Sequence, residues 1–401
     1  MCNMKYLNLK FSFLNASFYL IYGIIYGYAA YYLEAKGSSG TDVGIVFSVS
    51  SAACIILQLF LGSFLDRNTQ YSAKDIIFLF SIVLTASVAV LYFKPAGTIS
   101  MLCFIIILML LLVDSSLFNA FGMEYINAGY RLNYSLSRGI GSLAYSVATL
   151  IMGFAISRTS ENIIIPAFMI VQMVVFFAMF IIKPAGRNQN RTCLSYAENK
   201  KRVGVSIFAL LRKRLEVLQL LCGILLMYLS YTAINNFHIN IVGSVGGGSR
   251  ELGISTSIAA FIELPAMSLF LPLSKRFSFE RLLRFSCFFF IVKVALMCLA
   301  SSTHAIYAIQ TLQLLSYGLF IPSSTYYINS ILDKSDMAKG QTLLGIFTFG
   351  LSGLISSLLS GMILDRFNVR TLLIIMTFLA VAGFIITVSA LRRIRALSQS
   401  Y

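Results

Sequence analysis

The sequence predicts an all-α membrane protein in which twelve transmembrane helices form two pseudo-symmetric bundles of six. Three observations support this fold class: the composition, a series of long apolar windows, and the distribution of Lys and Arg between those windows. Of the 401 residues, 58% are hydrophobic and 11% are charged, and the mean hydropathy is +0.84. Soluble domains carry about a quarter charged residues, so this much apolar surface requires lipid as its solvent.

Twelve apolar windows approach the roughly 20 residues that a helix needs to cross a bilayer. The first runs from about Lys10 to Leu33. It is too long, and too rich in Tyr and Gly, for the apolar region of a cleaved signal peptide. The boundary between the ninth and tenth windows, at Ser301–His304, is the least distinct. The windows are centred near residues 21, 54, 84, 110, 148, 173, 230, 262, 291, 318, 353 and 381.

Basic residues are concentrated in alternate connecting segments, which the positive-inside rule assigns to the cytoplasm. The opposite segments hold only Lys36, Lys94, Arg158, Arg250, Arg366 and Arg370. This pattern predicts a multi-pass protein of the cell membrane (plasma or inner), with both termini in the cytoplasm. It also explains the net charge of +16 as a signal of topology, so no nucleic-acid partner is expected.

One long polar connection divides the chain. We expect an N-terminal six-helix bundle over residues 1–183, a cytoplasmic linker over 184–214, and a C-terminal six-helix bundle with a short basic tail over 215–401. A short sequence motif that occurs twice supports nested inverted repeats. The segment Gly62-Ser-Phe-Leu-Asp66-Arg67 ends the second window, and Gly361-Met-Ile-Leu-Asp365-Arg366 ends the eleventh, on the opposite face in the predicted topology.

Charged side chains within the windows are costly in lipid and therefore indicate function. Glu263, Lys293 and Asp114 interrupt apolar runs, Arg138 begins the fifth window, and Glu124 lies near the cytoplasmic end of the fourth. A pair between Arg138 and Glu263, across the two halves, would offer donors and acceptors suited to hydroxyl groups. Lys293 is expected either to line a cavity or to pair with Asp114 or Glu263.

Several of these segments resemble known transporters. The spacing of Gly62, Asp66 and Arg67 resembles the loop signature of the major facilitator superfamily, in which it contributes to a gate. Stretches from Ser39 to Phe47, from Tyr134 to Ser142 and from Thr256 to Leu264 are similar to the lactose-permease-like branch, which moves oligosaccharides or nucleosides with protons. The resemblance runs from about residue 7 to 385. It implies alternating access, in which two bundles rock around a midplane site.

The resemblance also implies roles for single residues. At the positions of Arg138 and Glu263 the family holds sugar hydroxyls, with the acid at Glu124 assisting. Tyr145 occupies the position at which the family stacks an indole on the sugar ring. A structural ion pair between the halves is the alternative for Arg138 and Glu263, and Arg138 has the further option of extending to the inner interface.

The proton relay of the resembled family is largely neutral in this chain. Its positions on the seventh and tenth windows read Thr232, Asn235, Gln313 and Ser316. A proton therefore remains a possible coupling ion only through Asp114, Glu124, Glu263 or His238, and uniport or coupling to Na⁺ stays open. The polar residues of the seventh window would suit hydroxyl or nucleobase recognition; they are Asn235, Asn236, His238 and Asn240.

These patterns predict a monomeric secondary transporter of a small polar solute, a sugar, oligosaccharide or nucleoside, with membrane lipid as its surroundings. An exporter of drugs or metabolites is the alternative, favoured by the Phe- and Met-rich windows, and a channel or membrane-embedded sensor is more remote. The sequence contains two His, no HExxH, no GxSxG and no nucleotide-binding glycine loop. We therefore expect no enzyme activity, no cofactor and no metal site.

Overall fold

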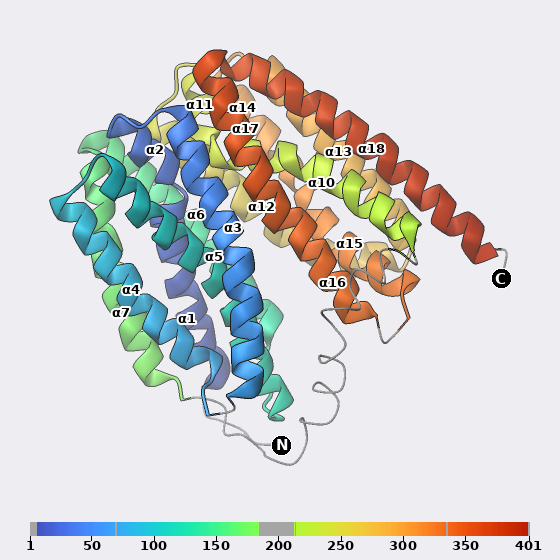
Figure 1. Ribbon diagram of the computed structural model, residues 1–401, viewed down its shortest axis with the longest axis horizontal. Coiled ribbons are helices and arrows are strands. Elements are labelled where there is room, and N and C mark those ends of the chain that lie inside the picture. Colours follow the sequence, from blue (N-terminus) through green and yellow to red (C-terminus); the bar gives the residue numbers. More distant parts are fainter. Residues whose placement is uncertain (1–5, 69, 184–211, 213, 334–335, 400–401) are drawn as a thin grey trace. The chain divides into compact units, whose positions relative to one another are not determined.

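The computed structural model describes residues 6–68, 70–183, 212, 214–333 and 336–399, and every regular element among them is helical (Figure 1). Eleven spans in this part of the chain are long and apolar enough to cross a membrane, from Leu7–Ala35 to Val369–Leu397. They correspond to eleven of the twelve predicted windows. The remaining window is α12, a continuous helix over Ser249–Ser274. The predicted all-α, twelve-helix architecture is confirmed.

The chain divides into two compact units. The first unit is Met1–Cys193 with Gly247–Phe261, and the second is Leu194–Gly246 with Ile262–Tyr401. The boundary falls within α12, so the two halves of this helix belong to different units. The division predicted at residues 184–214 assigns all of α12 to the C-terminal bundle, and it stays a prediction. Nearly all of that predicted linker lies outside the described residues.

The first unit contains the first six spans. Its first span is not one regular helix, because a π-helical turn separates α1 from α2. α1 packs against α6 and α7, α4 packs against α5 and α7, and α3 packs against α5. In chain order the elements are α1 (Leu7–Ile21), η1 (Tyr22–Tyr26), α2 (Ala29–Ala35), α3 (Gly40–Arg67), α4 (Ala73–Phe93), α5 (Thr98–Asn127), α6 (Tyr134–Arg158), η2 (Glu161–Ile163) and α7 (Ile164–Ile181).

Short polar residues start two of these helices. At the start of α3, the Ser39 hydroxyl accepts from the Asp42 N–H at 3.1 Å, and the Asp42 carboxylate accepts from the Ser39 N–H at 3.0 Å. Ser72 and Asp75 form the same kind of capping box at the start of α4. These bonds satisfy N–H groups that have no partner within the helix. The chain can therefore enter each span without leaving those donors unpaired.

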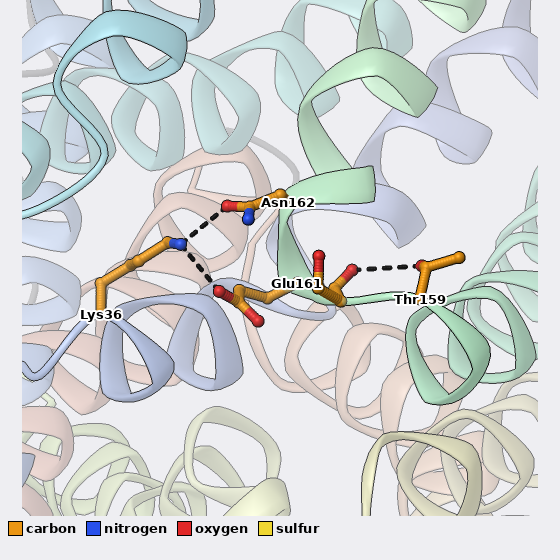
Figure 2. A network of polar contacts seen from close by, with 5 residues as sticks. Lys36, Thr159, Glu161 and Asn162 are labelled. Carbon is orange, nitrogen blue, oxygen red and sulfur yellow. Dashed lines mark hydrogen bonds and ion pairs between the residues drawn. The ribbon is translucent and has the colours of Figure 1, made fainter.

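Lys36 links the first span of this unit to the sixth. Its ammonium donates to Glu161 Oε1 and to Asn162 Oδ1, both at 2.7 Å, as Figure 2 shows. Lys36 directly follows α2, and Glu161 and Asn162 form the turn η2 that leads into α7. The contact holds these two chain segments together at the end of the unit that the predicted topology places outside.

The second unit contains the remaining spans. α10 lies along α18, which also packs against α13, and α13 packs against α15 (Figure 1). Two of its spans are irregular: the tenth contains a 3₁₀ turn and the eleventh a π-helical turn. The elements are α10 (Leu215–Asn236), α11 (His238–Gly243), α13 (Phe279–Leu299), α14 (Thr303–Gln310), η3 (Thr311–Gln313), α15 (Tyr317–Ile331), α16 (Met337–Gly345), η4 (Ile346–Leu351), α17 (Ser352–Arg366) and α18 (Val369–Gln399).

Two glycines allow α10 and α18 to approach closely. A Cβ added at Gly383 would lie 2.6 Å from the Gly223 carbonyl oxygen and 2.9 Å from the Met227 amide nitrogen. A Cβ added at Gly223 would lie 2.8 Å from the Thr387 amide nitrogen. Because these neighbours are backbone atoms, they cannot move aside as a flexible side chain can. Small residues at helix crossings are the usual basis of close packing in membranes.

We therefore expect Gly383→Ala to destabilise the second unit by about 1–3 kcal/mol, the usual cost of overpacking. The measurement is the melting temperature of the purified protein in detergent. Gly345→Ala is the matched control, because a Cβ at Gly345 meets nothing within 4 Å and alanine favours a helix over glycine. Equal melting temperatures for the two variants would contradict this account of the α10–α18 contact.

Candidate functional site

A buried polar network in the second unit joins two of the charged residues that the sequence singled out. Lys293 on α13 is 5% exposed, and its ammonium donates to Gln313 Oε1. The Gln313 amide in turn donates to Glu263 Oε1 at 2.9 Å. A glutamine side chain thus connects a lysine and a glutamate of opposite charge. Of the two partners predicted for Lys293, the structure brings Glu263 near it, through this amide.

An irregular tenth span positions Gln313. α14 ends at Gln310, η3 covers Thr311–Gln313, and α15 begins only at Tyr317. Gly318 lets this break lie against α12, because a Cβ there would be 2.5 Å from Ala266 Cβ and 3.2 Å from the Gln313 carbonyl oxygen. Broken helices that line a site at mid-membrane depth are a recurrent feature of transporter binding sites.

Aromatic rings accompany this network. The rings of Tyr231 on α10 and Tyr317 on α15 stack in parallel, with centroids 4.6 Å apart and planes 6° apart. Tyr317 directly follows the break that carries Gln313. The second unit therefore places one ring of a flat aromatic pair, Tyr317, on the span that carries Gln313, and the other ring, Tyr231, on α10.

The predicted polar residues of the seventh span have different surroundings. Asn235 is exposed, whereas its neighbour Asn236 is buried and donates to Ser357 Oγ at 2.9 Å. His238 is buried, and its Nε2 lies 3.0 Å from Gln310 Nε2. Asn240 is half-buried on α11. The buried amide of this pair is Asn236, a distinction that depends on how α10 is rotated toward α17.

In the first unit, Arg138 lies one turn into α6. Its guanidinium donates to Ser142 Oγ at 2.8 Å and lies over the Tyr19 ring, 4.6 Å from the centroid. Gly141 makes room for that ring, since a Cβ there would lie 3.0 Å from Tyr19 Cε2. Burial raises the pKa of nearby Tyr134 to about 12, so this phenol is neutral at physiological pH and supplies no counter-charge to Arg138.

Tyr145 lies on the same helix as Arg138 and belongs to an aromatic group. Its ring centroid is 6.1 Å from that of Tyr22, which stacks on Tyr26 at 4.5 Å and 18°. The π-helical turn η1 carries both Tyr22 and Tyr26, and such turns are frequent at functional sites. Tyr145 was among the residues predicted from the sequence, whereas Tyr22 and Tyr26 were not. Their spacing of four residues, one helical turn, was the signal available.

Glu124 has a structural contact at the end of the first unit where α4 begins. Its Oε1 accepts from the Ala73 N–H at 2.9 Å, at the first residue of α4. A carboxylate at a helix start satisfies an otherwise unpaired donor and interacts favourably with the helix dipole. The structure therefore places Glu124 at the start of α4, where it accepts from the helix N-terminus.

The remaining predicted residues lie apart from these clusters. Asp114 is buried near the middle of α5, and its Oδ1 has no hydrogen-bond partner among the described residues. Gly62 and Arg67 lie in the last turns of α3, where Arg67 is exposed, and the side chain of Asp66 is outside the described set. Arg138 belongs to the first unit and Glu263 to the second, and the pair predicted between them stays a prediction.

One cavity of about 400 Å³ lies between α4 and α7 of the first unit. Its lining is apolar: Ala89, Tyr92, Phe93, Ile165, Pro166, Met169 and Ile170. It offers almost no polar group to a solute. Within the described part of the chain, no group of three or more His, Cys, Asp and Glu side chains is arranged to hold a metal ion.

Comparisons with known proteins agree with this architecture. Residues 6–375 match the model of a family described as the MFS_1 like family. No curated protein sequence matches the chain. The chain is similar to the crystal structure of the nucleoside transporter NupG, with a TM-score of 0.79 at 15% identity, covering 96% of this chain and 99% of that one. An aspartate-to-alanine mutant of NupG gives a TM-score of 0.81 with the same identity and coverage.

A second transporter shares the fold. It is a bacterial homolog of the human lysosomal transporter Spinster, in an inward-facing and unoccupied conformation, with a TM-score of 0.70 at 12% identity, covering 99% of this chain and 97% of that one. At these identities the solved structures establish the fold alone, and the family match covers most of the sequence. The predicted membership of the major facilitator superfamily is confirmed: the chain belongs to the MFS_1 like family and is a multi-pass membrane transporter of that fold.

Proposed function

We propose that the protein carries a small polar solute, a sugar, oligosaccharide or nucleoside, across the cell membrane by alternating access. The observation that carries this proposal is the Lys293–Gln313–Glu263 network. Ammonium, amide and carboxylate groups together offer donors and acceptors for hydroxyl groups and for the edges of a nucleobase. A hydroxyl-rich solute can replace the bridging amide as a partner of both charges, which an apolar solute cannot.

The aromatic residues support a solute that contains a ring. The stacked Tyr231 and Tyr317 in the second unit, and Tyr22, Tyr26 and Tyr145 in the first, present flat faces near polar groups. Such faces pack against sugar rings and nucleobases. NupG, whose fold this chain shares, is a nucleoside transporter, so nucleosides belong among the first solutes to test. Both termini are proposed to lie in the cytoplasm.

The proposed solute class is tested by counterflow of sugars and nucleosides in proteoliposomes that contain the purified protein. We expect saturable counterflow of at least one member of this class and none of a hydrophobic cationic dye. Counterflow of the dye alone would support the alternative, an exporter of drugs or metabolites. Unsaturable flux of all solutes would instead indicate a channel.

Replacing the bridging amide should weaken transport without unfolding the protein. Hydrogen bonds to charged groups contribute about 1.5–3 kcal/mol each. We therefore expect Gln313→Ala to lower counterflow by about tenfold or more, since 1.4 kcal/mol corresponds to tenfold. Gln219→Ala is the matched control, because Gln219 lies on α10 of the same unit and its hydrogen bond to Ser389 is exposed. Equal counterflow in both variants would place the solute site elsewhere.

Arg138→Lys tests whether transport requires the guanidinium group of Arg138 in the first unit. Lysine keeps the positive charge but loses the planar fork and its stacking on Tyr19. We expect counterflow to fall by about tenfold, roughly 1.4 kcal/mol, with an unchanged melting temperature. Arg158→Lys, at the exposed end of the same helix, should retain wild-type counterflow. A fully active Arg138→Lys protein would show that a point charge at this position is sufficient.

A further inference from the structure

Asp114 is a buried acid that the proposed solute site does not use. It lies near the middle of α5, a helix of 30 residues, and is 1% exposed. Its Oδ1 has no hydrogen-bond partner among the described residues. An ionised carboxylate in such a place loses its hydration without compensation. Retaining an acid at this depth therefore calls for a function that needs one.

The charged groups of α3, which packs against α5, lie toward its two ends. Gln58 on α3 donates to Ser116 on α5 at 2.9 Å, which aligns these two helices. Asp42, at the start of α3, is sixteen residues from Gln58, or about 24 Å along the helix. Arg67, in the last turn, is nine residues away, or about 13 Å. The titratable group on α3 near this level is Cys54, a buried thiol.

The charges of α4 lie at its inner end. The Ala73 N–H bonds Glu124, which is ten residues, or about 15 Å, from Asp114 along α5. The two charged residues of α4 directly follow Ala73. Lys74 donates to the Ile182 carbonyl, and Asp75 caps its own helix start.

The other elements that contact α5 are α2 and η1, α1 through the rings of Phe18 and Phe118, and α6 through Tyr134 and Asn119. Lys10, the cation of α1, lies in the first turn of that helix, and Arg138 of α6 donates to Ser142 Oγ and lies over the Tyr19 ring. The acid of α2, Glu34, lies in the last turn of that short helix, at the end opposite to the start of α4 in the predicted topology. The titratable groups of η1 are the neutral phenols Tyr22 and Tyr26. Among the described residues no charged side chain forms a hydrogen bond with Asp114 Oδ1, and protonation removes the cost of burying its charge.

The other candidate proton carriers are already engaged. Glu124 caps α4, Glu263 accepts from Gln313, and His238 lies beside Gln310. We propose that Asp114 is the proton carrier of this transporter: the carboxylate takes up H⁺ from water to form the neutral acid and releases it again within each transport cycle. This inference rests on the proposed function and deepens it, because it assigns the coupling ion to a residue of the first unit. The neutral Gln313 and Ser316 of the tenth span are then no obstacle to proton coupling.

Asp114→Asn separates coupling from transport, because asparagine mimics the protonated acid and cannot release a proton. In proteoliposomes with uridine as the probe, we expect the variant to retain counterflow within about twofold. Accumulation of uridine driven by a pH gradient should fall by about tenfold or more, to the level without a gradient. Asp42→Asn is the matched control: it removes a half-buried carboxylate at the start of the adjacent helix α3, and should keep both activities. Undiminished gradient-driven accumulation in Asp114→Asn would overturn the inference.

A second measurement does not depend on the solute. Because burial penalises the charged form, wild-type protein and Asp42→Asn should lose melting temperature relative to Asp114→Asn as the pH rises from about 5 to about 9. Identical pH profiles for all three proteins would overturn the inference. A wild-type protein without uridine counterflow would count against nucleoside transport, and the pH profiles would then decide the role of Asp114 independently.

Discussion

Charged and polar groups inside a bilayer must find their partners within the protein, and this constraint shapes the second unit. Lys293 and Glu263 would each be costly alone in lipid. Gln313 gives each charge a partner: its amide oxygen accepts from the Lys293 ammonium, and its amide N–H donates to the Glu263 carboxylate. The amide reaches both groups because the tenth span leaves helical geometry at η3. One hydrogen-bonded bridge thus links two opposite charges within the unit, at the helix break beside which Gly318 approaches Ala266.

Irregular turns in otherwise long helices carry several of the aromatic and polar residues of the candidate site. In the first unit η1 carries the stacked Tyr22 and Tyr26, and in the second η3 carries Gln313 next to Tyr317. A regular span satisfies its backbone internally, so an irregular turn requires neighbouring helices to compensate. Close contacts through glycine, such as Gly23 against Ala148 and Gly318 against Ala266, provide such neighbours. The two units therefore combine close helix packing with irregular turns at the residues that we propose contact a solute.

The chemistry is divided between the two units. A cation lies beside aromatic rings in the first, through Arg138 and Tyr19, while the second holds a neutralised pair of charges. Asp114 lies on a different helix from Arg138 and from the aromatic residues of α1. Proton binding at such a position need not compete directly with solute binding, so coupling would operate through the packing of α5 against its neighbours. This arrangement differs from the resembled permeases, in which the relay lies on the seventh and tenth spans.

The sequence by itself determined the membrane class, the twelve windows and the residues that carry charge into them, because length and hydropathy are local properties of the chain. It also identified Glu263, Lys293 and Asp114 as charges within apolar runs, and the structure buries Lys293 and Asp114 and half-buries Glu263. Only the tertiary structure decided which groups meet. It made Gln313 the bridge, placed Glu124 at the cap of α4, and turned Asn236 inward in place of Asn235. Those outcomes depend on helix rotation and on breaks in the spans, which arise from packing between distant segments and have no local signature.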